Sequence, residues 1–418
     1  MTGMPDRRPP GVREFESDPL PHLLDWLRQP APDGVYPVGT GPDLLVVADW
    51  ALTRDLLADP EERFTARSAV FGAVPSWVSG SAHTRALTSP LARYLDMLWR
   101  RVTDEEIRAA AANATGPDHR WPTAGVLLYW RLFARLLVPD LPERVLRRAE
   151  RAILLAERIG DRAGGRRLLR LRRRLVSSTA MAGLADLSAD RRAEPDAPDD
   201  LGRLLRDFFD SDDDVAVATF ALFGAVCRAS SSVLSWILLL DAGWRLGTGA
   251  GVTLRGTRAS APAADRVREA LRLWPATWLI EREVRRETWL GAHRLKPGDL
   301  AYVCPILLHR DPATWTEPAE YRPRRWAAPP ERYREAYLPF GTGPGACVGA
   351  RFVTAMPARI LAVLDEGDPL AVTVHGAAPR FDAICAPPAF SLGSQPRSDT
   401  TRADRSGHPN VRGQLRAL

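Results

Sequence analysis

The spacing of apolar and polar residues along the chain predicts a mainly helical protein with a minor β-sheet region. Helical spacing dominates between residues 90 and 185, whereas residues 278–304 alternate apolar and polar positions around a turn at 296–298. The elements expected, in chain order, are a hairpin at 36–48, a helix near 49–57, helices between 90 and 185, an acidic surface loop at 186–214 around a short helix at 201–209, a long helix at 215–240, a Gly/Thr linker at 247–257, a helix through 266–273 and short strands at 278–304.

The segment 215–240 (VAVATFALFGAVCRASSSVLSWILLL) is apolar on nearly all sides and long enough to cross a bilayer. Arg228 stands in its middle, directly before a run that contains three serines, and an arginine inside a membrane is costly. Three aspartates precede the segment, as is usual at the start of a helix. We therefore expect a buried central helix of a soluble protein and no membrane span.

Composition narrows the class of protein further. The chain has 418 residues, a hydrophobic content of 45% and a net charge of +6, which together exclude global disorder and give no nucleic-acid-binding signature. Its four cysteines are far apart, with no CxxC pair, and its N-terminus is polar, so we expect a reduced, cytoplasmic, monomeric protein. Only one residue, Lys296, is a lysine, an arginine bias typical of a GC-rich bacterial genome. Residues 1–393 are expected to form one domain, followed by a disordered polar tail at 394–418.

One loop, residues 338–352 (LPFGTGPGACVGARF), concentrates the candidate chemistry. Its glycines allow positive φ angles or a close approach to another group, and its single cysteine, Cys347, directly precedes a helix start at Ala350. Backbone amides near a metal-bound thiolate tune its electronic properties. The loop therefore predicts a thiolate ligand beside a flat, bulky group.

The loop resembles the haem-binding pattern of the cytochrome P450 family, Phe-Gly-x-Gly-x-(Arg/His)-x-Cys-x-Gly. The matching residues here are Phe340, Gly341, Gly343, Cys347 and Gly349. The resemblance implies the cytochrome P450 fold, haem b as cofactor, and Cys347 as the axial thiolate and metal ligand, whose electron donation favours O–O cleavage.

Other segments extend the resemblance over roughly residues 30–392. Glu269 and Arg272 match the family's Glu-x-x-Arg pair, and Arg325, in YRPRRW, matches the arginine that completes a buried network with that pair. Removing one member of a buried charge pair leaves the other without compensation. We therefore expect these three residues to be structural.

The central helix departs from the family at the positions that deliver protons to iron-bound dioxygen. The family has an acidic residue followed by threonines, whereas this chain has Arg228, Ala229 and Ser230. Ser230 is a poor replacement for the first hydroxyl, since a shift of one position rotates a helical side chain by about 100°. These three residues are the candidate catalytic positions.

The groups expected to bind the haem propionates are also fewer than usual. His83 and Arg282 match cationic positions of the family, but Leu87 and Gly345 replace two others. Haem should still bind through Cys347 and apolar contacts, with weaker anchoring of its carboxylates.

Three functions are compatible with these residues. The first is an oxidoreductase that hydroxylates or couples a small natural product or peptide, with electrons from a ferredoxin-type partner. The second is a peroxide-dependent enzyme in which Arg228 holds the carboxylate of an acidic substrate. The third is a non-catalytic partner of another biosynthetic enzyme, although such relatives usually lose the cysteine. The arginine-dense segment 166–176 (RRLLRLRRRLV) is expected to be a solvated helix face, with an acidic partner as the alternative.

Overall fold

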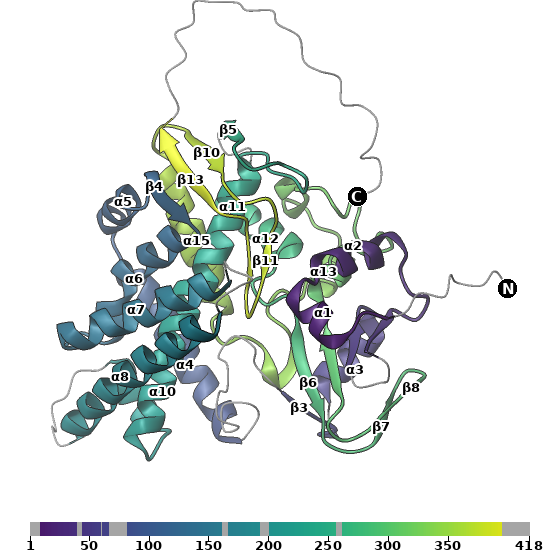
Figure 1. The fold of residues 1–418 in the computed structure, drawn as a ribbon, viewed down its shortest axis with the longest axis horizontal. Coiled ribbons are helices and arrows are strands. Elements are labelled where there is room, and N and C mark those ends of the chain that lie inside the picture. The colour runs from purple at the N-terminus through teal and green to yellow at the C-terminus, as the bar shows by residue number, and fades with distance from the viewer. Residues whose placement is uncertain are drawn as a thin grey trace, which may run out of the picture.

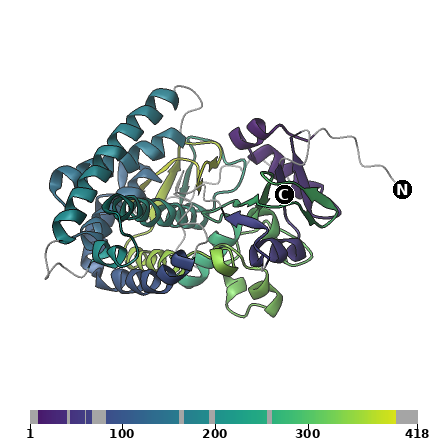
Figure 2. The same cartoon turned by 90° about the horizontal axis from the view of Figure 1, so that it is seen from below.

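The chain forms a mainly helical region and a second region built around a five-stranded sheet (Figure 1). The structure is a computed structural model that describes residues 9–39, 44–59, 61–66, 82–160, 166–192, 200–255 and 261–394. Side chains are further left undescribed at 82–85, 158–160, 166–170, 255, 344 and 394. Seen from below, the long helices again lie on one side and the N-terminal helices on the other (Figure 2).

Helices account for most of the described residues, as the apolar spacing predicts. The N-terminal and sheet-side helices are α1 (Val12–Ser17), α2 (Leu20–Arg28), α3 (Trp50–Ala58), α13 (Pro305–Leu308) and α14 (Glu331–Glu335), with short 3₁₀ turns η3 (Pro323–Trp326) and η4 (Gly343–Gly345). The helical region contains α4 (Ala82–Arg101), α5 (Asp104–Ala112), α6 (Thr123–Leu137), α7 (Glu143–Gly160), α8 (Arg166–Arg192), α9 (Leu201–Arg206), α10 (Asp212–Gly224), the π-helical turn η2 (Ala225–Ala229), α11 (Ser230–Asp241), α12 (Ala263–Leu273) and α15 (Ala350–Asp365).

The strands form two sheets and two small hairpins. The larger sheet has the order β1 (Val35–Val38), β2 (Leu44–Val47), β9 (Leu300–Val303), β6 (Ile280–Val284) and β3 (Phe64–Ala66), with β2 and β9 parallel and the other neighbours antiparallel. The second sheet has the order β4 (Gly116–Trp121), β13 (Phe390–Ser394), β10 (Leu370–Val374) and β5 (Thr253–Arg255). The hairpins are β7 (Thr288–Leu290) with β8 (His293–Leu295), and β11 (Arg380–Phe381) with β12 (Cys385–Ala386).

The predicted central helix runs from Asp212 to Asp241 as α10, η2 and α11. Within the described chain it is the one helix long and apolar enough to span a membrane, but 72% of its most apolar window is buried inside the protein. Every residue of α11 from Ser230 to Leu240 is buried, and Trp236 stacks on Trp274 of the next segment with ring centroids 4.5 Å apart. The prediction of a buried core helix is confirmed.

Four features differ from the sequence expectations. Strand β4 lies in a region expected to be helical, and β5 lies in the expected linker. Both are edge strands of the four-stranded sheet, β4 paired with β13 and β5 paired with β10. Strand β4 is mostly exposed, so its sequence has no alternation of apolar and polar residues that would predict a strand.

Helix α8 also continues to Arg192, into the expected surface loop. Its polar end is held by charges that come from other segments, since buried Arg191 pairs with Asp200 and Asp140. Finally, Ser394 closes β13 instead of opening the expected tail, and the remainder of that tail, 395–418, lies outside the described residues.

Candidate functional site

The loop before α15 is closed by its own backbone. The amide of Cys347 donates to the carbonyl of Phe340 at 2.9 Å, and the amide of Ala350 donates back to the Cys347 carbonyl at 3.2 Å. The cysteine therefore lies at the end of a tight ring, immediately before the helix.

The Cys347 thiol is accessible to solvent. The surrounding protein atoms nevertheless desolvate the thiol, which raises its pKa. The hydrogen bond from the Gly349 amide to the sulfur lowers the pKa and is the smaller effect. A thiol in such a place becomes a thiolate when a metal ion binds it.

Two of the loop glycines are required by geometry. Gly341 and Gly343 have φ angles of +67° and +70°. A Cβ atom on Gly343 would also lie 2.8 Å from the Leu57 carbonyl oxygen, at the end of α3. Gly349 differs, because a Cβ there would make only ordinary contacts, the nearest being Leu95 at 3.8 Å.

Arg282, on strand β6, brings a buried positive charge to this loop. Its side chain is 7% exposed, and its guanidinium lies 3.1 Å from where a Cβ on Gly345 would stand. Burial lowers the pKa of Arg282, and only the more distant Asp59 opposes this shift. Within the described residues its one hydrogen-bond acceptor is the Glu281 carbonyl, at 3.0 Å, and no carboxylate pairs with it. The charge is therefore available to an anionic group at the loop.

A buried polar network connects this loop to helix α12. Glu269 accepts from Arg272 at 2.8 and 3.0 Å and from Arg325 at 3.0 Å, and all three side chains are at most 7% exposed. The residues predicted as a structural network are thus brought together in the structure.

His309 joins the network to the loop, a role that the sequence analysis did not assign. Its Nδ1–H donates to the Arg272 carbonyl at 2.9 Å, and its Nε2 accepts from the Leu338 amide at 2.8 Å. Burial, with the Arg272 charge next in importance, lowers the pKa of His309 to about 3. The neutral ring therefore fixes the first residue of the cysteine loop.

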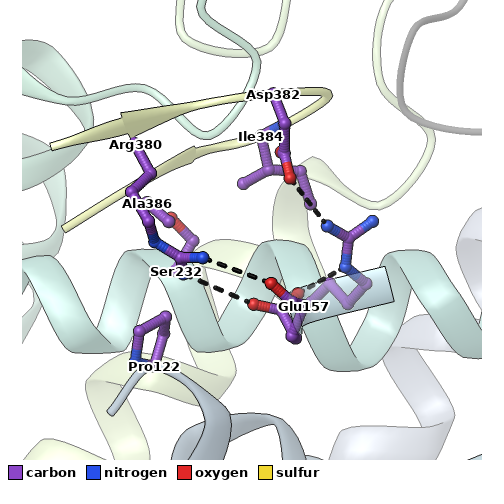
Figure 3. A pocket seen from close by; sticks show the side chains of 8 residues that line it. Pro122, Glu157, Ser232, Arg380, Asp382, Ile384 and Ala386 are labelled. Carbon is purple, nitrogen blue, oxygen red and sulfur yellow. Dashed lines mark hydrogen bonds and ion pairs between the residues drawn. The ribbon is translucent and has the colours of Figure 1, made fainter. Parts of the chain in front are cut away.

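Arg228, in the π-helical turn, lies in an ion cluster. Its Nε donates to Glu157 of α7, its Nη2 lies 3.5 Å from Asp382 in the β11–β12 hairpin, and Arg380 lies 3.7 Å from the other Glu157 oxygen. Figure 3 shows Glu157 below the hairpin, with Arg380 on one side. Although burial opposes the charge, Glu157 and Asp382 raise the pKa of Arg228.

The cluster borders a small recess with room for about one water molecule, which is too small for a substrate. Arg228 is therefore paired by carboxylates from other segments of the fold. Glu157 and Asp382 lie 71 and 154 residues away in sequence, so no local signal could have identified them.

The other two candidate catalytic residues differ from one another. Ala229 packs against the main hydrophobic core. Ser230 is fully buried, and its hydroxyl has no hydrogen-bond partner within the described residues.

Comparison with known proteins agrees with this arrangement. Residues 264–364, which include the network and the cysteine loop, match the family model described as Cytochrome P450. The fold is similar to that of the cytochrome P450DA haem domain, with a TM-score of 0.66 and 18% identity over 94% of this chain and 97% of that one. It is equally similar to a mutant of P450 EryK in complex with erythromycin B, with a TM-score of 0.65 and 19% identity over 91% and 98%.

The chain has the cytochrome P450 fold. A cyclooctatin synthase of Streptomyces melanosporofaciens is 44% identical over 88 residues, 20% of this chain and 19% of that protein. Cytochrome P450 139 of Mycobacterium bovis is 30% identical over 172 residues, 37% and 40% of the two chains. The matched segments thus span at most about two-fifths of these relatives.

The residues present fit the haem b that cytochrome P450s bind through a cysteine thiolate. Cys347 supplies the one thiol, Gly349 supplies an amide to its sulfur, and Arg282 supplies a buried cation without a carboxylate partner. The Arg282 guanidinium lies against Gly345, where the family usually has a basic residue, so a second cation there would be crowded and repelled. Leu87 is half-buried against the core, and the side chain of His83 lies outside the described residues.

Proposed function

We propose that this cytochrome P450 is a haem-thiolate oxidoreductase that carries out an oxidative tailoring step, a hydroxylation or coupling, on a small natural product or peptide. The observation that carries the proposal is the accessible Cys347 thiol at the end of a closed loop whose Gly345 lies against Arg282, a buried cation without a carboxylate partner among the described residues. The names of two similar proteins, a cyclooctatin synthase and an enzyme crystallised with erythromycin B, support a role in biosynthesis.

In this proposal Cys347 binds the haem iron, and Arg282 pairs with a haem carboxylate. The haem supplies the oxidising chemistry when it is bound. The protein holds the ligand cysteine through the Phe340 carbonyl and the His309–Leu338 hydrogen bond, so that the thiolate is placed before the cofactor arrives.

Proton delivery must differ from the usual family arrangement, because positions 228 and 229 have neither an acid nor a hydroxyl. The Ser230 hydroxyl is the remaining group on this turn that is buried without a partner in the described structure. We assign it a hydrogen bond to water or to the substrate. Arg228 already has two protein carboxylates, so the structure gives no support to the peroxide-dependent alternative, which needs its charge for a substrate.

A ferredoxin-type electron donor fits the surface near the cysteine loop. Helix α4 touches this loop, since Leu95 lies against Gly349. Its outer side exposes Arg93, Met97 and Arg101, spaced four residues apart on one face. A basic face with one apolar residue near the proposed haem ligand suits an acidic redox protein.

The test is the spectrum of the purified protein after reduction under carbon monoxide. The wild type should give the red-shifted Soret band of a thiolate-ligated ferrous complex, and Cys347→His should bind haem but lose that band. Arg282→Ala should retain the band but release haem more readily to apomyoglobin. A wild-type protein that takes up no haem, even after reconstitution, would instead support the non-catalytic partner.

A further inference from the structure

The N-terminal half of α8 exposes two leucines with no function in the site. Leu171 and Leu175 are 53% and 60% exposed, and they lie one turn apart on the same face of the helix. Helices α7 and α8 lie side by side at the edge of the molecule, on the side opposite the five-stranded sheet (Figure 1). Isolated exposed leucines are common, so a function for these two has to come from the residues around them.

The leucines begin a seam with the spacing of a coiled coil. Leu171, Leu175, Ser178 and Ala182 follow one another at intervals of four, three and four residues, and all four are exposed; we call them the α8 seam. The Ser178 hydroxyl is bonded to the Arg174 carbonyl at 2.8 Å, so it needs no other partner. Such a narrow stripe is the signature of helix-to-helix packing.

Arginines flank the leucines on both sides. With Leu175 at an a position and Leu171 at the preceding d position, Arg172 occupies e and Arg174 occupies g. In a coiled coil, the charges at e and g form ion pairs with the partner helix and so determine which helix binds. In the sequence, Leu168 and Arg167 continue the same spacing, although their side chains lie outside the described residues.

The flanking charges are unpaired, unlike those at the other end of the same helix. Arg191 and Arg192 bind Asp200, Asp140 and Asp212, whereas no ion pair is recorded for Arg172 or Arg174 in the described structure. On the neighbouring α7, the exposed Arg151 likewise has no ion pair among the described residues, whereas Arg144 and Arg148 lie nearer the other end, where Val145 packs against Gly183. Among the described side chains, Arg172 and Arg174 therefore present positive charge on both sides of the leucines without a carboxylate partner.

We propose that the α8 seam docks an amphipathic α-helix of another protein, with apolar residues along one stripe and acidic residues on both sides of it. A second copy of this chain is disfavoured, because pairing two such seams would oppose arginine to arginine. A lipid surface is disfavoured because the apolar stripe is narrow, whereas helices that lie on membranes have a broad apolar face. Docking of this helix at the α8 seam requires neither bound haem nor the proposed oxidation reaction.

The probe is a 21-residue acetylated and amidated peptide with leucine at a and d and glutamate at e and g, labelled at one end. Its anisotropy is followed as the full-length protein is added at low salt. Arg172→Glu with Arg174→Glu should weaken binding about tenfold (about 1.4 kcal/mol), since each reversal places glutamate opposite glutamate at an e or g position. The same variant should bind a matched peptide with lysine at e and g, which the wild type rejects. Leu171→Ser with Leu175→Ser should weaken both interactions.

The control is Arg144→Glu with Arg148→Glu, which changes the net charge equally but on α7. It should weaken binding less than about threefold. Equal losses for the two double variants would reduce the effect to overall charge and overturn the proposal. Equal affinity of the wild type for the acidic and the basic peptide would also overturn it. Two further outcomes would do the same: phosphatidylglycerol vesicles that bind the protein and displace the peptide, or a dimer of the free protein that Arg172→Glu dissociates.

Discussion

The role of Arg228 is not evident from the sequence and becomes clear from its ion pairs in the structure. In the sequence it is an unexplained charge in the middle of an apolar helix. In the structure its side chain is 12% exposed and belongs to a four-residue cluster with Glu157, Arg380 and Asp382. Its first role is therefore to connect the central helix to α7 and to the β11–β12 hairpin.

Replacing Arg228 with alanine should lower the free energy of unfolding by about 2–4 kcal/mol, because Glu157 stays buried with one cation fewer. Chemical denaturation measures this loss. As control, Arg245→Ala breaks an exposed pair with Glu320, 73% and 41% exposed, and should cost less than about 1 kcal/mol.

The same variant tests whether Arg228 also binds substrates. Spectral titrations with an acidic and a neutral ligand should show similar changes for Arg228→Ala, since the arginine is already neutralised by protein carboxylates. A selective loss of the acidic ligand would restore the peroxide-dependent hypothesis.

His309 should make stability depend on pH. Its folded pKa of about 3 lies below the unfolded value of about 6.5, so the unfolded chain binds a proton first as the pH falls. This contribution is complete above about pH 6.5 and is lost progressively towards pH 3. At pH 5 the loss should be about 2 kcal/mol.

Denaturation of the wild type and of His309→Gln at pH 8 and pH 5 provides the measurement. The variant should be less stable at pH 8 but should lose less stability between the two pH values. An identical loss in both proteins would mean that other groups control the acid response.

At the scale of elements, the cysteine loop depends on the end of α3. Gly343→Ala should destabilise the protein by about 2–4 kcal/mol, because it adds a clash with the Leu57 carbonyl to the strain of a positive φ angle. Gly298→Ala is the matched control, with φ +94° and no atom within 4 Å of the added Cβ, and should cost about 1–2 kcal/mol. Thermal melts would disprove the role of α3 if the two variants behaved alike.

The elements also show which predictions a single sequence supports. The central helix, α12, the first hairpin and the small strands at 280–303 were predictable, because their apolar periodicity is local. Strands β4 and β5 were not, because they form only through pairing with β13 and β10, more than a hundred residues away. The same limit applies to the site: the loop and the Glu269 network have local patterns, whereas Glu157, Asp382 and His309 act through contacts between distant segments.

For the whole molecule, the basic face of α4 should control electron transfer. Arg93→Glu with Arg101→Glu should raise the KM for a ferredoxin several-fold and reduce the salt dependence of reduction, while the carbon monoxide spectrum stays unchanged. Reduction kinetics at increasing salt test this. The α8 pair Arg172→Glu with Arg174→Glu is the control, since it changes the net charge equally and should leave the KM as it is.

The ion cluster at Arg228 also restricts how this protein can evolve. An acidic residue at position 228, as cytochrome P450s usually have on this helix, would lie beside Glu157 and Asp382, which makes three carboxylates with only Arg380 among them. An acid at position 228 therefore requires a compensating change at Glu157, so the two positions are coupled although they lie on different helices. Any substitution that returns an acid to this turn has to be made together with one that removes the negative charge of Glu157.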